Sequence, residues 1–500
     1  MIHKIVFDDE ISVWWDRLSL KEGEYYAIYK NGALYGKTIK THYEIKDLTA
    51  DCEFEIGVEI CSKYHQTIQV LLSETIRTPK RKNILDVTKA PYFAIGDGTT
   101  LNTKAIQKAI DDCGINDKVY FPKGIFLSGA LNLHSNLELY FEESSILQGT
   151  SDIEDYLPQI KSRYEGIERI CYQSLLNVGQ LDHKEGYTTE NIVLRGKGAI
   201  LGGGQELLHK CVGVDSSTWQ KNGNGLYRRV REEEIVDWDL WRSRGRLIHI
   251  CNTKNVVIYG LKLAYSPAWN VHMIYSRDIT TACCHIESVG VNNGDGWNPD
   301  SSENCTLYGT VFNTGDDCVA IKSGKNPEGN VINRMCKNIK VFDCFSIDGH
   351  GYSIGSEMSG GVENVSFWDC DLVNTVFGIQ IKATAKRGGY VRNIQAHNCS
   401  APCVMIWMVN YNDDGESANK FPLLHDYNFE DLLLTGAIMV ECDEPPIVPA
   451  IKLLGLKEED AWITNVRFKN ITIIRQTESA VDQVQIRNVK ELKMENVISK

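Results

Sequence analysis

The sequence has no long hydrophobic run, little proline and a deficit of basic residues. A membrane-spanning helix needs about 18 consecutive apolar residues, and no such run occurs in the 500 residues. Proline contributes 12 residues and glycine 41, which excludes a collagen-like or low-complexity chain. Acidic residues outnumber basic ones by 66 to 53, so the formal charge is −13. General nucleic-acid binders and binders of anionic membranes show the opposite balance, so we expect neither kind of partner.

The 16 cysteines lack a metal-binding arrangement. No CxxC segment pairs with a second one or with HxxxH, so we expect no zinc site. We also expect no cofactor. Most cysteines stand singly in apolar runs, as reduced core residues do, for example Cys251, Cys305, Cys344 and Cys370. The first ten residues do not read as a secretory signal. This favours a cytoplasmic location, with secretion as the alternative if a signal has been removed.

The length indicates two domains or an elongated repeat, because single cores stop growing at about 250–300 residues. Residues 1–85 contain short strand-like segments separated by turns, such as Lys30-Asn31-Gly32. This pattern is typical of a small antiparallel β-sandwich. The segment also resembles a fibronectin type III domain, with a tryptophan on an early strand followed by a Tyr-x-x-Tyr strand. We place the second domain at 86–500.

A repeat of short strands fills the second domain. A polar residue, usually asparagine, precedes an alternating strand at Asn191, Asn255, Asp278, Asn304, Asn338, Asn364, Asn393 and Asn465. Successive intervals from Asn255 are 23, 26, 34, 26 and 29 residues, about one coil of a solenoid. The repeated asparagine is interpreted as a turn residue that tolerates left-handed backbone. We therefore expect an all-β chain: a right-handed parallel β-helix, capped by an amphipathic helix at 103–110 and preceded by the sandwich.

The densest group of polar residues lies between positions 293 and 387. It contains Asn293-Gly294-Asp295-Gly296, Gly315-Asp316-Asp317-Cys318, Gly349-His350-Gly351 and Gln380-Ile381-Lys382. Residues about one coil apart stack on the same face of a solenoid, so we expect Asp295 beside Asp316 and Asp317. Carboxylates this close cannot all ionise freely, and at least one pKa must rise. A protonated carboxylic acid beside a carboxylate is the arrangement that glycoside hydrolysis requires.

These four segments, in this order, resemble the signature motifs of glycoside hydrolase family 28, the polygalacturonases. The resemblance implies a parallel β-helix, metal-free inverting hydrolysis and a pectic oligosaccharide or polysaccharide as the substrate. It implies that Asp316 is the general acid and that Asp295 and Asp317 position and deprotonate the attacking water. His350 would support the protonation of the acid or bind substrate.

The candidate substrate-binding residues are Lys382, Gln380, Arg387, Asn293, Lys322 and Trp269. The resemblance pairs Lys382 with a galacturonate carboxylate. The family usually reads Arg-Ile-Lys where this chain has Gln380, whose neutral amide cannot form a bidentate ion pair. Either Arg387 at the rim compensates, or the sugar at that position is neutral, such as rhamnose. Trp269 is equally well explained as core filler, and Lys322 as a surface charge.

The function that we expect is exo-acting, inverting hydrolysis of galacturonosidic bonds in pectic oligosaccharides. The exo preference rests on the N-terminal sandwich, which accompanies some exo-acting family members, and on long loops expected at 150–170, 210–245 and 410–450. Three alternatives stay open: a rhamnogalacturonan-type hydrolase, a pectate lyase on the same fold, and a non-catalytic glycan-binding β-helix. The sequence leaves the oligomeric state open.

Overall fold

The structure is a computed structural model, and it describes residues 2–184, 186–409, 413–438, 447–474 and 483–500. Part of the loop expected at 410–450, residues 410–412 and 439–446, thus lies outside the described residues. No helix within the described ranges is long and apolar enough to cross a membrane. The chain divides into two compact units, Met1–Asn83 and Ile84–Lys500.

The first unit consists of two antiparallel sheets around a core of its own. The smaller sheet has the order β1 (Ile2–Val6), β2 (Ile11–Trp15), β5 (His42–Ile45). The larger sheet has the order β4 (Ala33–Thr38), β3 (Tyr25–Lys30), β6 (Glu53–Cys61), β7 (Thr67–Arg77). Trp15 of the first sheet meets Tyr26 of the second edge to face, with ring centroids 4.9 Å apart. The small antiparallel fold expected here is therefore present, and the fibronectin type III resemblance stays a prediction.

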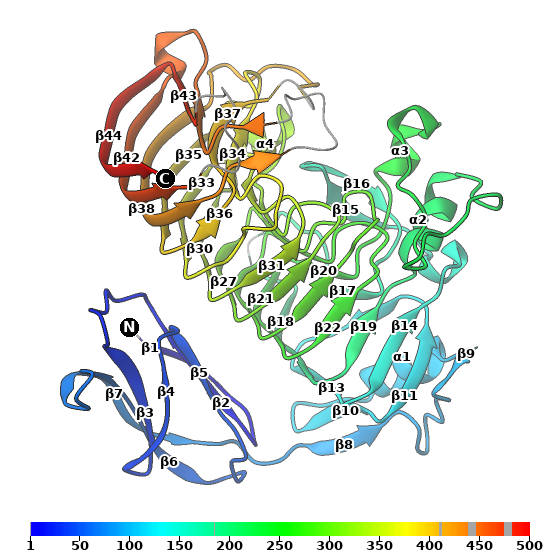
Figure 1. The fold of residues 1–500 in the computed structure, drawn as a ribbon. Helices are drawn as coiled ribbons and strands as arrows, with labels where there is room; N and C mark the ends of the chain where they lie inside the picture. The colour runs from blue at the N-terminus through cyan, green and yellow to red at the C-terminus, as the bar shows by residue number, and fades with distance from the viewer. Residues whose placement is uncertain (1, 185, 410–412, 439–446, 475–482) are drawn as a thin grey trace. The chain divides into compact units, whose positions relative to one another are not determined.

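The second unit is a stack of coils whose strands form three long parallel sheets (Figure 1). The first sheet contains β8 (Asn83–Asp86), β10 (Asp117–Phe121), β13 (Leu137–Phe141), β18 (Thr189–Gly196), β21 (Thr253–Tyr259), β24 (Arg277–Ala282), β27 (Glu303–Tyr308), β30 (Cys336–Phe342), β33 (Val362–Trp368), β35 (Tyr390–His397), β38 (Leu423–Leu434), β42 (Ile463–Ile473) and β44 (Val489–Ser499), with β36 (Ser400–Ala401) beside β38. The second sheet contains β9 (Asp97–Leu101), β11 (Gly124–Ser128), β14 (Ser145–Gly149), β19 (Ala199–Leu201), β22 (Lys262–Ala264), β25 (His285–Glu287), β28 (Val311–Asn313) and β31 (Phe345–Asp348).

The third sheet positions the candidate residues and is called the site sheet below. In order, it contains β12 (Leu131–Leu133), β17 (Leu176–Val178), β20 (Ile248–Cys251), β23 (Val271–Ile274), β26 (Trp297–Asp300), β29 (Val319–Ile321), β32 (Tyr352–Ile354), β34 (Ile379–Ala383), β37 (Val404–Met408), β41 (Ile451–Leu454) and β43 (Val484–Arg487). Alternate residues of each strand face the core, as Ile379 and Ile381 do on β34, while the residues between them face outward.

The core of this unit is a continuous column of stacked apolar side chains. Equivalent positions repeat from rung to rung, for example Ile339, Val365 and Ile394 on the first sheet. Helix α1 (Thr103–Asp111) buries Ile106 and Ile110 against the first coils. The predicted all-β class, with a parallel β-helix and an amphipathic helix at 103–110, is confirmed.

The repeated asparagines form a ladder along the first sheet. All of them have left-handed backbone, with φ between 53° and 60°. Their side-chain amides bond from rung to rung: Asn338 Nδ2 donates to Asn304 Oδ1 at 2.9 Å and Asn364 Nδ2 to Asn338 Oδ1 at 3.0 Å. The interpretation of these residues as turn formers is confirmed, because asparagine enters this backbone region at little cost.

Several shorter elements lie outside the three sheets. Two hairpins are formed by β15 (Ile160–Tyr164) with β16 (Ile167–Cys171), and by β39 (Ala437–Ile438) with β40 (Ile447–Val448). The remaining helices are α2 (Gly204–Val212), α3 (Trp238–Trp241), α4 (Glu328–Ile332) and short 3₁₀ turns at Ile153–Tyr156, Glu232–Glu234 and Glu459–Ala461.

Candidate active site

Neighbouring coils bring the predicted acidic residues together at the site sheet. The candidates lie on or just before successive strands: Asp295 before β26, Asp316 and Asp317 before β29, His350 before β32 and Lys382 on β34. Backbone bonds fix their register, since Gly296 N–H donates to the Asp317 carbonyl and His350 N–H to the Asp316 carbonyl, each at 2.9 Å. The stacking that the repeat predicts is therefore present in the structure.

Glycines on both sides of His350 allow its loop to pass close to the neighbouring rungs. Gly349 has φ of 126° and Gly351 has φ of 96°, a region that favours glycine. A Cβ on Gly349 would stand 2.2 Å from Thr314 Oγ1, and one on Gly351 would stand 2.2 Å from the Gly378 carbonyl oxygen. Both positions therefore require glycine if His350 is to lie beside Asp316.

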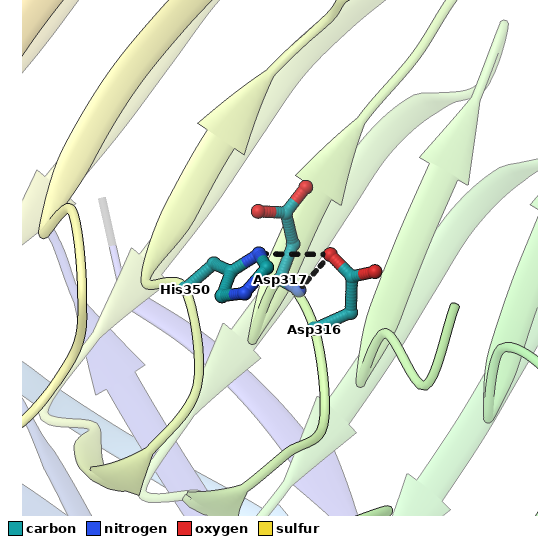
Figure 2. A group of neighbouring side chains, drawn as sticks. All are labelled: Asp316, Asp317 and His350. Carbon is teal, nitrogen blue, oxygen red and sulfur yellow. Dashed lines mark hydrogen bonds and ion pairs between the residues drawn. The ribbon is translucent and has the colours of Figure 1, made fainter. Parts of the chain in front are cut away.

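Asp316 and His350 form the exposed end of the cluster (Figure 2). His350 Nδ1 lies 3.1 Å from Asp316 Oδ1, and the backbone N–H of Asp317 donates to the same oxygen at 2.9 Å. The two side chains are 19% and 30% exposed. These two groups therefore lie where a ligand can approach them from solvent.

Asp317 and Asp295 lie deeper, each with its own polar contacts. Asp317 Oδ2 is 3.1 Å from Lys382 Nζ, and Asp317 Oδ1 accepts a 2.5 Å hydrogen bond from Ser353 Oγ. Asp295 Oδ2 accepts a 2.6 Å hydrogen bond from Asn298 Nδ2. Asp295 and Asp317 are therefore buried members of the same cluster, while Asp316 faces outward.

Two of the carboxyl groups, those of Asp295 and Asp316, have unequal affinities for a proton. Burial, with the charge of Asp316 beside it, raises the pKa of Asp295 well above its usual value. Burial alone would also raise the pKa of Asp316, yet His350, Arg229 and Lys382 hold it below its usual range. Asp316 in turn raises the pKa of His350, against the effect of burial. These environments therefore favour protonation of Asp295 and His350 over protonation of Asp316.

Lys322 anchors the deep side of the cluster. Its Nζ lies 3.2 Å from Glu357 Oε2 and 3.8 Å from Asp295 Oδ2, and it stands 5.2 Å from the centroid of the Trp269 ring. Lys322 is not a solvated surface charge, because its side chain is buried together with both carboxylates. Its position suits the electrostatic balance of the site rather than direct contact with a sugar.

Arg387 and Trp269, two of the predicted substrate-binding residues, do not lie at an open surface. Arg387, expected at the rim, is fully buried and donates to the Ser356 carbonyl and to Asn326 Oδ1. The expectation of a rim position is therefore wrong, because its guanidinium holds two loops together in the interior. Trp269 is also buried, stacked on Tyr164 at 4.7 Å between ring centroids, which favours the core reading.

Gln380 and Asn293 flank the cluster on different sides. Gln380 faces outward between Ser353 and Met405 in the register of the site sheet but is buried, and neither its amide nitrogen nor its amide oxygen has a hydrogen-bond partner among the described residues. Asn293 Oδ1 accepts a 2.7 Å hydrogen bond from Arg244. Asn293 is therefore part of the scaffold of the Asp295 loop.

Sequence reasoning missed the arginines that support this loop. Fully buried Arg244 donates to the Asn292 carbonyl at 3.0 Å as well as to Asn293, and Arg229 Nη2 lies 4.0 Å from Asp316 Oδ2. The available signal was the run of alternating arginines at 242, 244 and 246 directly before an apolar strand. An arginine in such a position is buried only with partners.

Asp316, Asp317 and His350 also have the spacing of a metal site. One ligand atom from each lies within 4.8 Å of the others, as in no other group of such residues in the described ranges. Lys382 and the imidazole of His350 already lie against these carboxylates, which reduces their attraction for a cation. A metal-free site stays a prediction.

The site sheet is covered on both sides of the acidic cluster. On the side of the earlier coils, the β15–β16 hairpin lies over β20 and β26: Ser162 Oγ is 2.9 Å from His249 Nε2, and Arg163 Nη1 is 3.0 Å from Asp300 Oδ1. The side chain of Arg163 is fully buried. A cavity of about 470 Å³ lies beside the same hairpin, lined in part by Lys161 of β15 and by outward residues of β12 and β17.

On the side of the later coils, an apolar cluster covers the outer face of β37. Met405, Trp407 and Val409 are buried there with Val448 of β40, and Phe377 packs against them. His350 meets Phe377 edge to face at 5.5 Å. The row of outward polar residues is therefore interrupted at β37, the strand after Lys382.

Neighbouring carboxyl groups of unequal proton affinity are the arrangement that the glycoside hydrolases, a carbohydrate-cleaving class of enzyme, use. The sequence model of Glycosyl hydrolases family 28 matches residues 175–416, which include all four motifs. Residues 175–416 thus match family 28, and the protein is a glycoside hydrolase.

Curated relatives extend the likeness beyond the matched segment. A probable polygalacturonase from Vitis vinifera is 29% identical over 401 residues, covering 76% of this chain and 73% of the relative. An exo-poly-alpha-D-galacturonosidase from Dickeya chrysanthemi is 24% identical over 495 residues, covering 95% of this chain and 81% of the relative. The second alignment thus includes the N-terminal unit.

Solved structures share the fold. The family 28 exopolygalacturonase of Yersinia enterocolitica matches with a TM-score of 0.78 at 20% identity, over 99% of this chain and 98% of that chain. The hyperthermoactive exopolygalacturonase of Thermotoga maritima matches with a TM-score of 0.68 at 27% identity, over 84% and 92%.

Proposed function

We propose that this protein hydrolyses galacturonosidic bonds in pectic oligosaccharides with inversion, removing sugars from chain ends. The observation that carries the proposal is the cluster of Asp295, Asp316 and Asp317 on adjacent rungs, in which Asp295 and Asp316 differ in proton affinity. The substrate class is supported by the names of the relatives.

Each acid has a role that follows from its position. Asp316, at the exposed end, protonates the glycosidic oxygen as the bond from that oxygen to the anomeric carbon breaks. Asp317, ion-paired with Lys382 at 3.1 Å, accepts a proton from the water that attacks the anomeric carbon from the opposite face. Asp295 lies beside both and orients that water.

His350 supplies the proton that Asp316 delivers. Its Nδ1–H points at Asp316 Oδ1 over 3.1 Å, and the adjacent carboxylate keeps the imidazole protonated to higher pH than usual. When the charge around Asp316 changes, the Nδ1–H bond breaks, an O–H bond forms on Asp316, and His350 becomes neutral. The pair thus titrates as one unit that holds a single transferable proton.

Exo action is supported by the covering of the site sheet. The β15–β16 hairpin covers the strands before the acids, and the Met405–Trp407–Val409 cluster covers the strand after Lys382. A polymer lying across the sheet in both directions would have to displace one of them. A chain end, by contrast, needs access only at Asp316 and His350, which are exposed.

A rhamnogalacturonan-type hydrolase is the second candidate, and Gln380 favours it. The amide has no hydrogen-bond partner among the described residues, and it cannot pair bidentately with a uronate as arginine does. A neutral sugar hydroxyl both donates and accepts, as the amide does.

Product analysis tests the proposal. The protein is incubated with polygalacturonate and with defined homogalacturonan and rhamnogalacturonan oligomers, and with Asp316→Asn as the inactive control. We expect steady release of monogalacturonate with slow loss of viscosity and no sensitivity to a chelator. Rapid loss of viscosity with little monomer refutes exo action. Unsaturated, ultraviolet-absorbing products indicate a lyase, preferred cleavage of rhamnogalacturonan fragments indicates the second candidate, and no product from any oligomer indicates a binding protein.

A further inference from the structure

Arg229 faces the exposed end of the acidic cluster from the segment that joins α2 and α3. Its Nη2 lies 4.0 Å from Asp316 Oδ2, and its side chain is 37% exposed. A separation of this length is a loose ion pair, with room for a water or another oxygen between the groups. The guanidinium therefore lies beside the path to Asp316 and is not committed to a tight contact with it.

The backbone next to Arg229 is fastened to the loop that carries Asp295. Val230 N–H donates to Asn292 Oδ1 at 2.9 Å, and Asn292 Nδ2 donates to the Val230 carbonyl at 2.9 Å. Val230 is buried, and Asn292 is half-buried. The start of the Arg229 side chain is thus held in place while its guanidinium reaches the surface.

The neighbouring basic residues on the same segment do not share this position. Arg228 donates to both carboxylate oxygens of Glu234, at 2.8 and 2.6 Å, and covers the ring of Trp219. Arg231 is 67% exposed and lies 4.0 Å from Glu233. Arg231 is therefore a matched control, two residues away, with the same charge and no contact with the acids.

The other cations of the cluster are buried in ion pairs. Lys382 lies on Asp317 at 3.1 Å, Lys322 lies on Glu357 at 3.2 Å, and Arg387 is fully buried between two loops. Arg229 combines exposure with a position next to Asp316, as His350 does, but unlike His350 it makes no close contact there.

We infer that Arg229 binds the carboxylate of the sugar on the leaving-group side of the scissile bond, and that this contact turns Asp316 into a proton donor. This inference rests on the proposed function: Arg229 is the residue that selects the substrate of the proposed hydrolysis. A planar guanidinium suits a carboxylate in a bidentate arrangement. Arg229 would thus provide the charge that Gln380 lacks.

The conversion of Asp316 into a proton donor follows from charge alone. In the empty site, Arg229 stabilises the carboxylate form of Asp316 and helps to keep its pKa low. A substrate carboxylate neutralises the guanidinium, so Asp316 gains affinity for the proton held by His350 at 3.1 Å. A substrate without that carboxylate leaves Arg229 on Asp316 and the proton on His350. Binding and acid catalysis are therefore coupled through one side chain.

The test compares digalacturonate with its analogue in which the reducing-end carboxylate is a methyl ester. The leaving oxygen is the same in both, so the difference isolates the carboxylate. We expect the full-length wild-type protein to prefer the free acid by about 10- to 100-fold in kcat/KM, the range for a charged hydrogen-bonded pair. In Arg229→Gln this preference should fall to about 1, whereas Arg231→Gln should keep it.

The pH profile gives a second readout that a purely structural role would not move. The alkaline limb of the kcat/KM profile should lie at higher pH in Arg229→Gln, because removal of the cation raises the pKa of the Asp316–His350 pair. If Arg229→Gln keeps the preference for the free acid, or loses activity equally on both substrates with an unmoved limb, the inference is wrong. If the wild type cleaves neither substrate, the proposed function itself fails, and the two failures are distinguishable.

Discussion

Two columns of polar side chains run along the same β-helix, and they differ in almost every physical respect. The asparagine ladder of the first sheet repeats one neutral residue, and each amide bonds to its copy on the next rung, at 2.6–3.0 Å from Asn304 to Asn393. The second column is the acidic cluster at the site sheet, and its residue type changes from rung to rung. It places acid against acid, with Lys382 and His350 beside them, and several of the pKa values depart from their ordinary range.

This difference distinguishes a column of residues that stabilises the fold from a column that serves catalysis. A ladder of identical amides satisfies every donor with an acceptor, so it needs no proton and no ligand. Charges stacked on neighbouring rungs leave protons unequally shared, so the column is costly to bury and chemically useful. The same β-helix carries an amide ladder and a column of stacked charges, and the residue type at each rung decides which of the two forms.

The largest effect is expected from replacing the proposed general acid, Asp316. Asp316→Asn should lower kcat by about two orders of magnitude or more, because the amide cannot donate a proton to the leaving oxygen. Steady-state rates on galacturonate oligomers measure the loss, and circular dichroism verifies the fold. Activity within tenfold of the wild type would remove Asp316 from the role of general acid.

Asp295→Asn should separate activity from stability. Turnover should also fall by about two orders of magnitude. The folded state, however, raises the pKa of Asp295 above its value in the unfolded chain, so folding favours the protonated acid. The wild type therefore loses stability as pH rises from the unfolded pKa toward the folded one, and asparagine avoids this loss.

The variant should consequently unfold at a higher temperature than the wild type at pH 7, with the difference vanishing below about pH 4. Thermal melts across this pH range make the comparison. A variant that is less stable at pH 7 would show that Asp295 is ionised in the folded protein.

His350→Gln should produce a smaller loss, about 10- to 100-fold, with a shifted pH profile. The pKa of His350 is raised in the folded protein, so its ion pair with Asp316 is present below the unfolded pKa of histidine and is lost as pH rises through the folded value. Without the imidazole, the proton is held by one carboxyl group alone. The alkaline limb of kcat/KM should therefore move to lower pH, and an unmoved limb would contradict the shared proton.

The smallest effect on activity is expected from substitutions in the asparagine ladder. Asn364→Ala removes two amide bonds and places alanine at a φ of 56°, so we expect a loss of about 1–3 kcal/mol in the free energy of unfolding with kcat unchanged. Asn364→Gly relieves the backbone strain and should lose less. Denaturant unfolding measures the stability of the two variants. A lower kcat in a variant that is fully folded would show that the ladder also contributes to catalysis.

The fold and the acidic cluster were accessible from the sequence because both are local consequences of the repeat. Spacing of one coil places Asp295 near Asp316, and glycines next to His350 mark the close approach of rungs. Arg387 and Trp269 were misplaced or left undecided because burial depends on loops that cross from other coils. Arg229 was missed for the same reason: its approach to Asp316 spans 87 positions in sequence.

The most direct test is a carbon-13 titration of the aspartate carboxyl groups in the substrate-free protein, with resonances assigned from Asp295→Asn and Asp316→Asn. The account predicts that the Asp295 carboxyl stays protonated at pH values where Asp316 has already ionised. Two resonances that titrate together, or Asp295 ionising first, would contradict the unequal sharing of protons on which the mechanism depends.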